Sequence, residues 1–169
     1  MFYLLIGLGN PGEKYKETRH NAGKLFIQRM NKGQGPRAKG QGDFKAVETE
    51  CFMNASGSWV KSFINHKSLF INHLIIAHDD LDIPLGKFKI QFGKGPRLHK
   101  GILSVEQALG TKEFWRVRIG VDARTKDEGR RTKDEGEDYV LERFTAEEKG
   151  ILESVFAEIR DRLLENVII

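Results

Sequence analysis

Short apolar runs and alternating stretches along the chain predict a set of β-strands. Residues 2–8 ("FYLLIGL") are almost entirely apolar and are followed by Gly9 and Pro11, a pattern typical of a buried strand. The stretch at 73–86 ("HLIIAHDDLDIPLG") predicts a short buried strand that runs into a polar loop. Three further stretches, at 44–50, 87–93 and 115–121, alternate polar and apolar residues, which indicates strands with one solvated face.

Apolar residues at helical spacing lie between these predicted strands. The spacing predicts helices at 22–31, 56–66 and 101–110, the last of them closed by Gly110. Thr145 and Glu148 form a capping-box pattern, which opens a further amphipathic helix. Strands that alternate with helices indicate a single α/β domain over residues 1–169, with helices on both faces of the sheet.

Length and composition are those of one globular domain. The chain has 169 residues, of which 39% are hydrophobic and 31% are charged. It has no apolar run of about 18 residues, the length that a membrane-spanning helix needs, so we expect no membrane partner. The single cysteine, Cys51, excludes an internal disulfide and fits a reducing cytoplasm.

The net charge of +4 is unevenly distributed. Cations gather at 24–45 and again at 87–100, whereas the segment 147–165 is acidic. The second cationic cluster, which has no acidic residue, consists of Lys87, Lys89, Lys94, Arg97 and Lys100. This asymmetry fits a face that attracts a polyanion such as nucleic acid, and it fits an ordinary solvated surface equally well.

One short repeat interrupts the α/β pattern. The sequence RTKDEG occurs at 124–129 and again at 131–136, and it contains no apolar residue. Because it cannot drive burial, we expect a flexible, charged loop at 123–138.

The glycine-rich start is compatible with a nucleotide-dependent enzyme. Gly7, Gly9 and Gly12 satisfy the spacing G-x-G-x-x-G, in which glycines let the backbone approach a pyrophosphate. A ribose-binding acid is expected about 20 residues further on, and none occurs at 30–32. The context therefore disfavours a dinucleotide.

His20 is the first candidate for catalytic chemistry. A histidine can act as a general base when a carboxylate fixes its tautomer, and Asp79, Asp80 and Asp82 follow the strand predicted at 73–78. If the first and third strands are parallel neighbours, His20 and one of these carboxylates meet at the same sheet edge. A histidine that only hydrogen-bonds within a loop is the alternative.

Other kinds of site have weaker support. The three aspartates with His78 offer ligands for a divalent cation, but consecutive residues of an extended chain point to opposite faces, so we expect no metal. No G-x-S-x-G element is present to supply a serine nucleophile. Activation of water by a base is the simplest hydrolytic mechanism. For Phe52 and Asn54 two interpretations are open: a core ring with a helix cap, or groups exposed to a substrate.

Several ordered blocks of this sequence resemble the bacterial-type peptidyl-tRNA hydrolases. The blocks are GLGNPGEKYKETRHNAG at 7–23, FMNASG at 52–57, AHDDLDIPLGKFKIQFGKG at 77–95, LHKGILSVEQALGTKEFWRVRIGV at 98–121 and YVLERFTAEE at 139–148. The resemblance implies a monomeric three-layer α/β/α domain around a mixed, twisted sheet, without metal or cofactor.

The same resemblance implies a reaction, namely hydrolysis of the ester that joins a peptide to the 3′ end of tRNA. His20 matches the general base that activates water, and Asp79 matches the carboxylate that orients it. Asn10 matches the residue that senses the blocked amino group and helps place the ester carbonyl. Three further positions line the site for the tRNA end and the peptide backbone: Tyr15, Phe52 and Asn54. We expect Lys87, Lys89, Lys94 and Arg97 to contact phosphates of the tRNA.

One departure from the resembled pattern affects the chemistry. The usual G-H-N-G reads LHKG here, so that Lys100 replaces an asparagine that helps position the substrate or water. A lysine adds three donors and a charge but loses the acceptor of the amide. Lys100 then either stabilises an oxyanion or grips the terminal phosphate, or it impairs catalysis. In the last case the chain is an RNA-binding relative with weak or no turnover.

Overall fold

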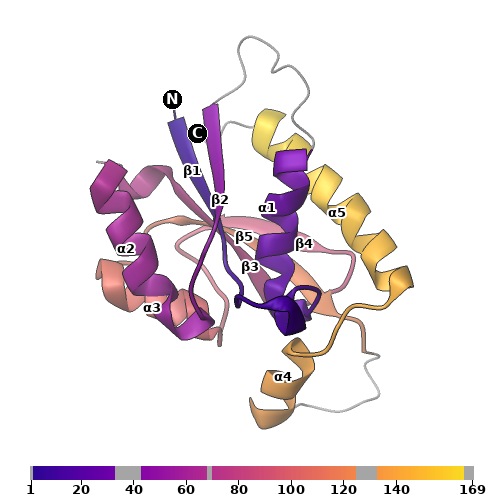
Figure 1. Cartoon of the computed structure of the whole chain (residues 1–169). Coiled ribbons are helices and arrows are strands. Elements are labelled where there is room, and N and C mark those ends of the chain that lie inside the picture. The colour runs from indigo at the N-terminus through magenta and orange to yellow at the C-terminus, as the bar shows by residue number, and fades with distance from the viewer. Residues whose placement is uncertain (1, 33–42, 68–69, 125–132, 166–169) are drawn as a thin grey trace.

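Five strands form one mixed sheet in the computed structural model, which describes residues 2–32, 43–67, 70–124 and 133–165 (Figure 1). The strands are β1 (Phe2–Gly7), β2 (Asp43–Glu48), β3 (Leu74–Pro84), β4 (Phe88–Phe92) and β5 (Trp115–Asp122). Their order across the sheet is β2-β1-β3-β5-β4. β4 runs antiparallel to β5, and the other neighbouring strands are parallel. The parallel strands therefore bring their carboxyl ends to one edge of the sheet.

Helices cover both faces of this sheet. The helices are α1 (Ala22–Lys32), α2 (Ser56–Lys67), α3 (Lys100–Leu109), α4 (Lys133–Val140) and α5 (Ala146–Glu165). Short 3-10 helices lie at η1 (Glu13–Tyr15), η2 (Arg19–Asn21), η3 (Met53–Ala55) and η4 (Ile71–His73). Figure 1 shows α1 and α5 on one face and α2 and α3 on the other, with α4 beyond the sheet edge. This is the three-layer arrangement that the sequence predicts.

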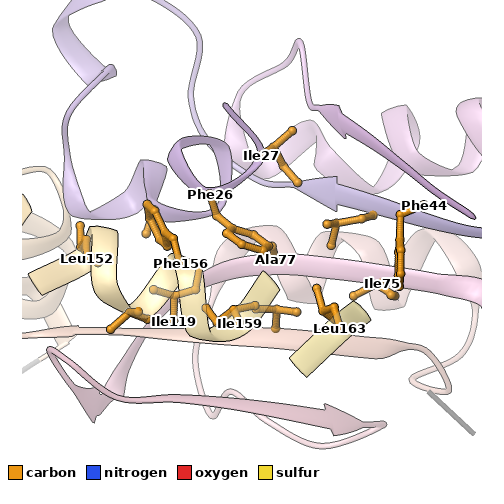
Figure 2. Close-up of a cluster of buried hydrophobic side chains, with 14 of the residues drawn as sticks. Phe26, Ile27, Phe44, Ile75, Ala77, Ile119, Leu152, Phe156, Ile159 and Leu163 are labelled. Atoms are coloured by element: carbon orange, nitrogen blue, oxygen red, sulfur yellow. The ribbon is translucent and has the colours of Figure 1, made fainter. Parts of the chain in front are cut away.

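Alternation of side chains along β3 builds a separate core on each face. Ile75 belongs to the core under α1 and α5, whereas Ile76 belongs to the core under α2 and α3. Figure 2 shows the first of these cores, in which the ring centroids of Phe26 and Phe156 lie 5.5 Å apart. Both rings are almost completely buried, so truncation of either one is expected to cost about 3–5 kcal/mol.

Two local signals in the sequence are confirmed at helix ends. The backbone N–H of Thr145 donates to the Glu148 carboxylate at 2.8 Å, and the N–H of Glu148 donates to the Thr145 hydroxyl at 3.2 Å. This reciprocal pair is a capping box. Gly110 ends α3 in the left-handed region, with φ of 68°, where glycine has no steric penalty.

The prediction of a polar loop after residue 78 is wrong, because β3 continues to Pro84. Asp79 and Asp80 are each only 2% exposed, and both pair in register with residues of β5. Since each carboxylate has a buried or half-buried partner, these polar residues are compatible with a buried strand.

The prediction of a loop at 123–138 is wrong at its carboxyl end, because residues 133–138 belong to α4. Tyr139 and Val140, just after the repeat, are buried and anchor this helix to the rest of the fold. Residues 125–132 lie outside the described residues. The extent of a single domain over 1–169 remains a prediction. Within the described ranges, no helix is both long and apolar enough to cross a membrane.

Candidate active site

His20 and Asp79 meet at the carboxyl edge of the sheet. His20 lies on η2, between β1 and α1, and Asp79 lies in β3, the parallel neighbour of β1. Nδ1 of His20 is 3.0 Å from both carboxylate oxygens of Asp79. The predicted contact is therefore confirmed. When Nδ1–H donates to Asp79, Nε2 carries the lone pair that a general base needs.

Neighbouring charges set the protonation states of this pair. Burial acts to lower the pKa of His20, but the Asp79 carboxylate outweighs burial and holds the pKa above its ordinary value of 6.5. Burial acts to raise the pKa of Asp79, but the imidazoles of His20 and His99 overcome it and hold the pKa well below its ordinary value. Asp79 is therefore ionised near neutral pH, where it stabilises a proton on His20.

His99 is a second imidazole on the same carboxylate. Its Nε2 lies 2.8 Å from Oδ1 of Asp79, and its Nδ1 accepts a hydrogen bond from the backbone N–H of Ile102. Because Nδ1 is an acceptor, Nε2 carries the proton and donates to Asp79. His99 is also the N-cap of α3, so the start of this helix fixes the ring. Its place in the LHKG block is the one signal in the sequence that points to it.

Asp80 points away from this cluster and serves a different contact. Its carboxylate accepts a hydrogen bond from Nε of Arg118 at 2.7 Å. Asp82 is exposed, and its backbone N–H donates to Oδ1 of Asp80. Asp79 and Asp80 therefore do not converge on one cation site, because neighbouring residues of β3 face opposite sides of the sheet.

The one group of side chains within the described ranges that could hold a metal ion is His20, Asp79 and His99. Each offers one ligand atom, and these atoms lie within 4.8 Å of one another. A bound cation would require both imidazoles to give up the N–H that points at Asp79. The geometry as it stands is that of a hydrogen-bonded network.

Asn10 is held beside this network by Asn21. The backbone N–H of Asn10 donates to Oδ1 of Asn21 at 2.8 Å, and Nδ2 of Asn21 donates to the Asn10 carbonyl at 2.9 Å. Oδ1 of Asn10 in turn accepts the backbone N–H of Met53 at 2.8 Å. With its oxygen engaged, the Asn10 amide presents its N–H₂ group as a donor. Asn21 directly follows His20, and no spacing in the sequence reveals this role.

Aromatic side chains form an exposed rim at the same edge. The rings of Tyr15 and Phe52 meet edge to face, with centroids 6.2 Å apart, and Phe52 is 54% exposed. Asn54 is exposed as well, and its carbonyl accepts the hydroxyl of Ser104. The interpretation of Phe52 as a core ring is therefore wrong. Asn54 lies inside η3 rather than at the cap position, which Phe52 occupies.

Comparison with known proteins identifies the family of this chain. The family model for peptidyl-tRNA hydrolase matches residues 4–168. The chain belongs to the peptidyl-tRNA hydrolase family. The peptidyl-tRNA hydrolase of Thermodesulfovibrio yellowstonii is 34% identical over 169 residues, which covers 92% of this chain and 87% of that protein. That of Geobacter metallireducens is 36% identical over 177 residues, which covers 97% of this chain and 88% of that protein.

A solved structure confirms the fold of this peptidyl-tRNA hydrolase family member. The crystal structure of peptidyl-tRNA hydrolase from Acinetobacter baumannii matches with a TM-score of 0.78 and 27% identity, over 96% of this chain and 88% of that chain. The predicted family, the α/β fold and the assignment as a hydrolase are thereby confirmed.

Lys100, the departure from the family pattern, forms an ion pair across the site. It is the first residue of α3, and its Nζ lies 2.8 Å from Oε2 of Glu137 on α4. The two side chains are 60% and 41% exposed, so the pair contributes little to stability. Both residues act electrostatically on His20: Lys100 acts to lower the pKa of His20, and Glu137 acts to raise it.

The cations expected to bind phosphate lie on β4 and its flanking loops. Lys87, Lys89, Lys94 and Arg97 are all exposed. In the antiparallel pairing of β4 with β5, Lys89 is the register partner of Arg118. Register partners of antiparallel strands lie side by side, so Lys89 adjoins Arg118. Arg118 in turn forms the ion pair with Asp80, the residue next to Asp79.

Two glycines of the opening fingerprint, Gly7 and Gly9, serve packing in this family member. A Cβ at Gly7 would collide with the backbone oxygen of Gly23, and one at Gly9 would lie 2.8 Å from the Lys24 side chain. These glycines let α1 pack closely against the end of β1, while α1 itself begins only at Ala22. The fingerprint therefore does not place a helix N-terminus at a phosphate.

Proposed function

We propose that this chain hydrolyses the ester between peptide and tRNA with a water molecule activated by His20. The contact of His20 with Asp79 carries the proposal, because it joins a base to a carboxylate that stabilises the protonated form of that base in a mostly buried setting. Nε2 of His20 takes a proton from water as the water oxygen attacks the ester carbonyl. The bond from that carbon to the tRNA 3′ oxygen then breaks, and His20 returns the proton to that oxygen.

Asn10 is proposed to place the ester carbonyl during this reaction. Its position is fixed by two hydrogen bonds to Asn21 and one from Met53. A donor that is fixed in advance needs no reorganisation when negative charge develops on the carbonyl oxygen. Tyr15, Phe52 and Asn54 form the adjoining surface for the tRNA end.

The catalytic proposal is tested by release of N-acetylated amino acids from tRNA. We expect wild type to release them and His20→Ala to lose about 10²-fold or more in kcat/KM. His73→Ala is the control, because His73 lies in η4, just before the first residue of β3, and its ring packs against Tyr3 and not against the catalytic network. Equal activity of wild type and His20→Ala would refute the proposal.

The tRNA contacts are proposed for the exposed cations Lys87, Lys89, Lys94 and Arg97. Each phosphate contact releases counterions, so KM rises with salt in proportion to the number of contacts. We expect Lys89→Glu to raise KM and to flatten its salt dependence, and Lys61→Glu on α2 to do neither. A KM for wild type that does not change with salt would contradict these contacts.

Assembly and location complete the proposal. We propose a monomer acting in the cytoplasm, where the half-buried thiol of Cys51 stays reduced. Burial raises the pKa of this thiol, which makes it a poor nucleophile. Light scattering of the purified chain tests the monomer.

A further inference from the structure

A groove of about 690 Å³ lies along β2, and His20 is not among the residues that line it. It is bounded by the end of β2, by α1 on one side and by α2 on the other. Its lining residues are Lys24, Asn31, Val47, Glu48, Thr49, Glu50, Trp59, Ser62, Phe63 and His66. We call this the β2 groove. None of the residues in the catalytic network lines it.

The floor of the β2 groove is the outer edge of a strand. Among the described strands, β2 is hydrogen-bonded only to β1, so it ends the sheet. The N–H of Thr49 donates inward to the Gly7 carbonyl at 3.1 Å. Along a strand of a parallel pair, the N–H and C=O of one residue point to one side and those of the next residue point to the other side. Because the N–H of Thr49 points toward β1, the N–H and C=O groups of Ala46 and Glu48 point away from β1, to the open edge. Such an edge can pair with an extended peptide.

The walls of the groove are suited to a chain of varied composition. On α2, the rings of Trp59 and Phe63 stack with centroids 5.0 Å apart and form an apolar wall. On α1, the ammonium of Lys24 is mostly buried, and burial lowers its pKa. Because pairing with a strand edge uses backbone groups, it tolerates different side chains on the bound peptide.

One end of the β2 groove adjoins the proposed catalytic site. Thr49 lines the groove, and its hydroxyl also lies 3.3 Å from the carbonyl of Gly9, the neighbour of Asn10. Lys24 lines the groove too, and its N–H donates to the carbonyl of Leu8. The chain that leaves the groove floor reaches Met53, whose N–H binds the side chain of Asn10.

The order of the strands suggests how a substrate would lie across the sheet. β4, with its exposed cations, forms one end of the sheet, and β2 forms the other. His20 and Asp79 lie over β1 and β3, between these two ends. A substrate with its tRNA at β4 and its ester at His20 extends toward β2 with its peptide.

We propose that the β2 groove binds the peptide part of peptidyl-tRNA as an extended strand alongside β2. This inference rests on the proposed function and adds a subsite that the catalytic residues do not define. The subsite matters only for substrates whose peptide is long enough to reach β2.

Substrate length provides the test. Ser62→Trp fills the groove from an exposed position of α2, and Lys61→Trp is the matched control on the same helix outside the lining. With hexapeptidyl-tRNA, we expect Ser62→Trp to lower kcat/KM about tenfold, the effect of losing one or two hydrogen bonds. With N-acetyl-aminoacyl-tRNA, we expect both variants to match wild type.

A second variant and a binding measurement keep the test independent of turnover. Glu48→Pro removes an outward N–H from an edge strand, where proline is tolerated, and is expected to give the same length-dependent loss. Binding is measured in the His20→Ala background, in which the ester survives, and the same variants should weaken only the long substrate. Equal effects on both substrates, or none on either, would overturn the groove proposal. Failure of wild type to cleave the short substrate would instead refute the proposed function.

Discussion

His99 and His20 contact the same oxygen of Asp79, at 2.8 Å and 3.0 Å respectively. The carboxylate is 2% exposed, so these two imidazoles are its main compensation for burial. Hydrogen bonding by His99 withdraws negative charge that would otherwise act on His20. His99 is therefore placed to tune the basicity of His20 through Asp79.

Substitution of His99 with asparagine should separate this tuning from the capping of α3. Asparagine is a good N-cap but is too short to replace the imidazole at Asp79. Asp79 would then act more strongly on His20 and raise its pKa, so the acidic limb of kcat/KM should move to higher pH. At pH 6 we expect a loss of about two- to tenfold. An unchanged pH profile would show that His99 is only structural.

Substitution of Asp79 with asparagine should move the same profile in the opposite direction. The carboxylate raises the pKa of His20 above 6.5, so its removal lets burial lower that pKa. The acidic limb should shift to lower pH, while the plateau rate falls about 10²-fold or more, because the charged His20 loses its partner. Steady-state kinetics between pH 5 and 9 on N-acetyl-aminoacyl-tRNA measures both effects. A lower plateau with an unmoved limb would contradict the role assigned to Asp79.

The pair formed by Lys100 and Glu137 tests the significance of the departure from the family asparagine. If Lys100 grips substrate phosphate, Lys100→Asn should raise KM about two- to fivefold, as expected of one exposed contact, with little change in kcat. Glu137→Gln should lower KM and move the acidic limb to lower pH, because it removes a charge that raises the pKa of His20. Lys61→Asn is the control. A gain in kcat for Lys100→Asn would favour the interpretation of a poorly active RNA-binding relative.

Stability of the η2 segment should depend on a buried ion pair. Nη2 of Arg19 lies 2.9 Å and 3.1 Å from the two oxygens of Glu148, and its side chain is 5% exposed. Removal of one partner leaves a buried charge, so Arg19→Ala should lower the free energy of unfolding by about 3–5 kcal/mol. Arg29 on α1 forms an exposed salt bridge to Glu153, which lies on α5 like Glu148. Arg29→Ala breaks this bridge and should lower the free energy of unfolding by about 1 kcal/mol or less. Urea unfolding of the two variants makes the comparison, and equal losses would contradict it.

The sequence predicts those parts of the fold whose signals are local. Apolar runs locate β1 and the buried half of β3, and their parallel pairing brings His20 to Asp79. The polar half of β3 escapes prediction because Asp79 and Asp80 find partners far away in the chain. The repeat at 124–136 suggests only a loop, since the buried residues that anchor α4 come after it.

A residue of the site can be predicted from the sequence where its type suggests a single chemical role. His20 fits this description, since a base needs a carboxylate and the sheet edge supplies one. His99 and Asn21 do not, because their roles depend on which side-chain atom faces a neighbour. Even the resemblance to the family, which assigns Asn10, does not reveal the two hydrogen bonds by which Asn21 holds it.

Two consecutive residues of β3 point their carboxylates to opposite sides of the sheet. Asp79 faces His20, and Asp80 faces Arg118. The insertion of a single residue within the strand before Asp79 would turn Asp79 toward the side of Arg118 and would bring His78 to the position that faces His20. The phase of β3 is thus as essential to the proposed chemistry as the identity of its aspartates.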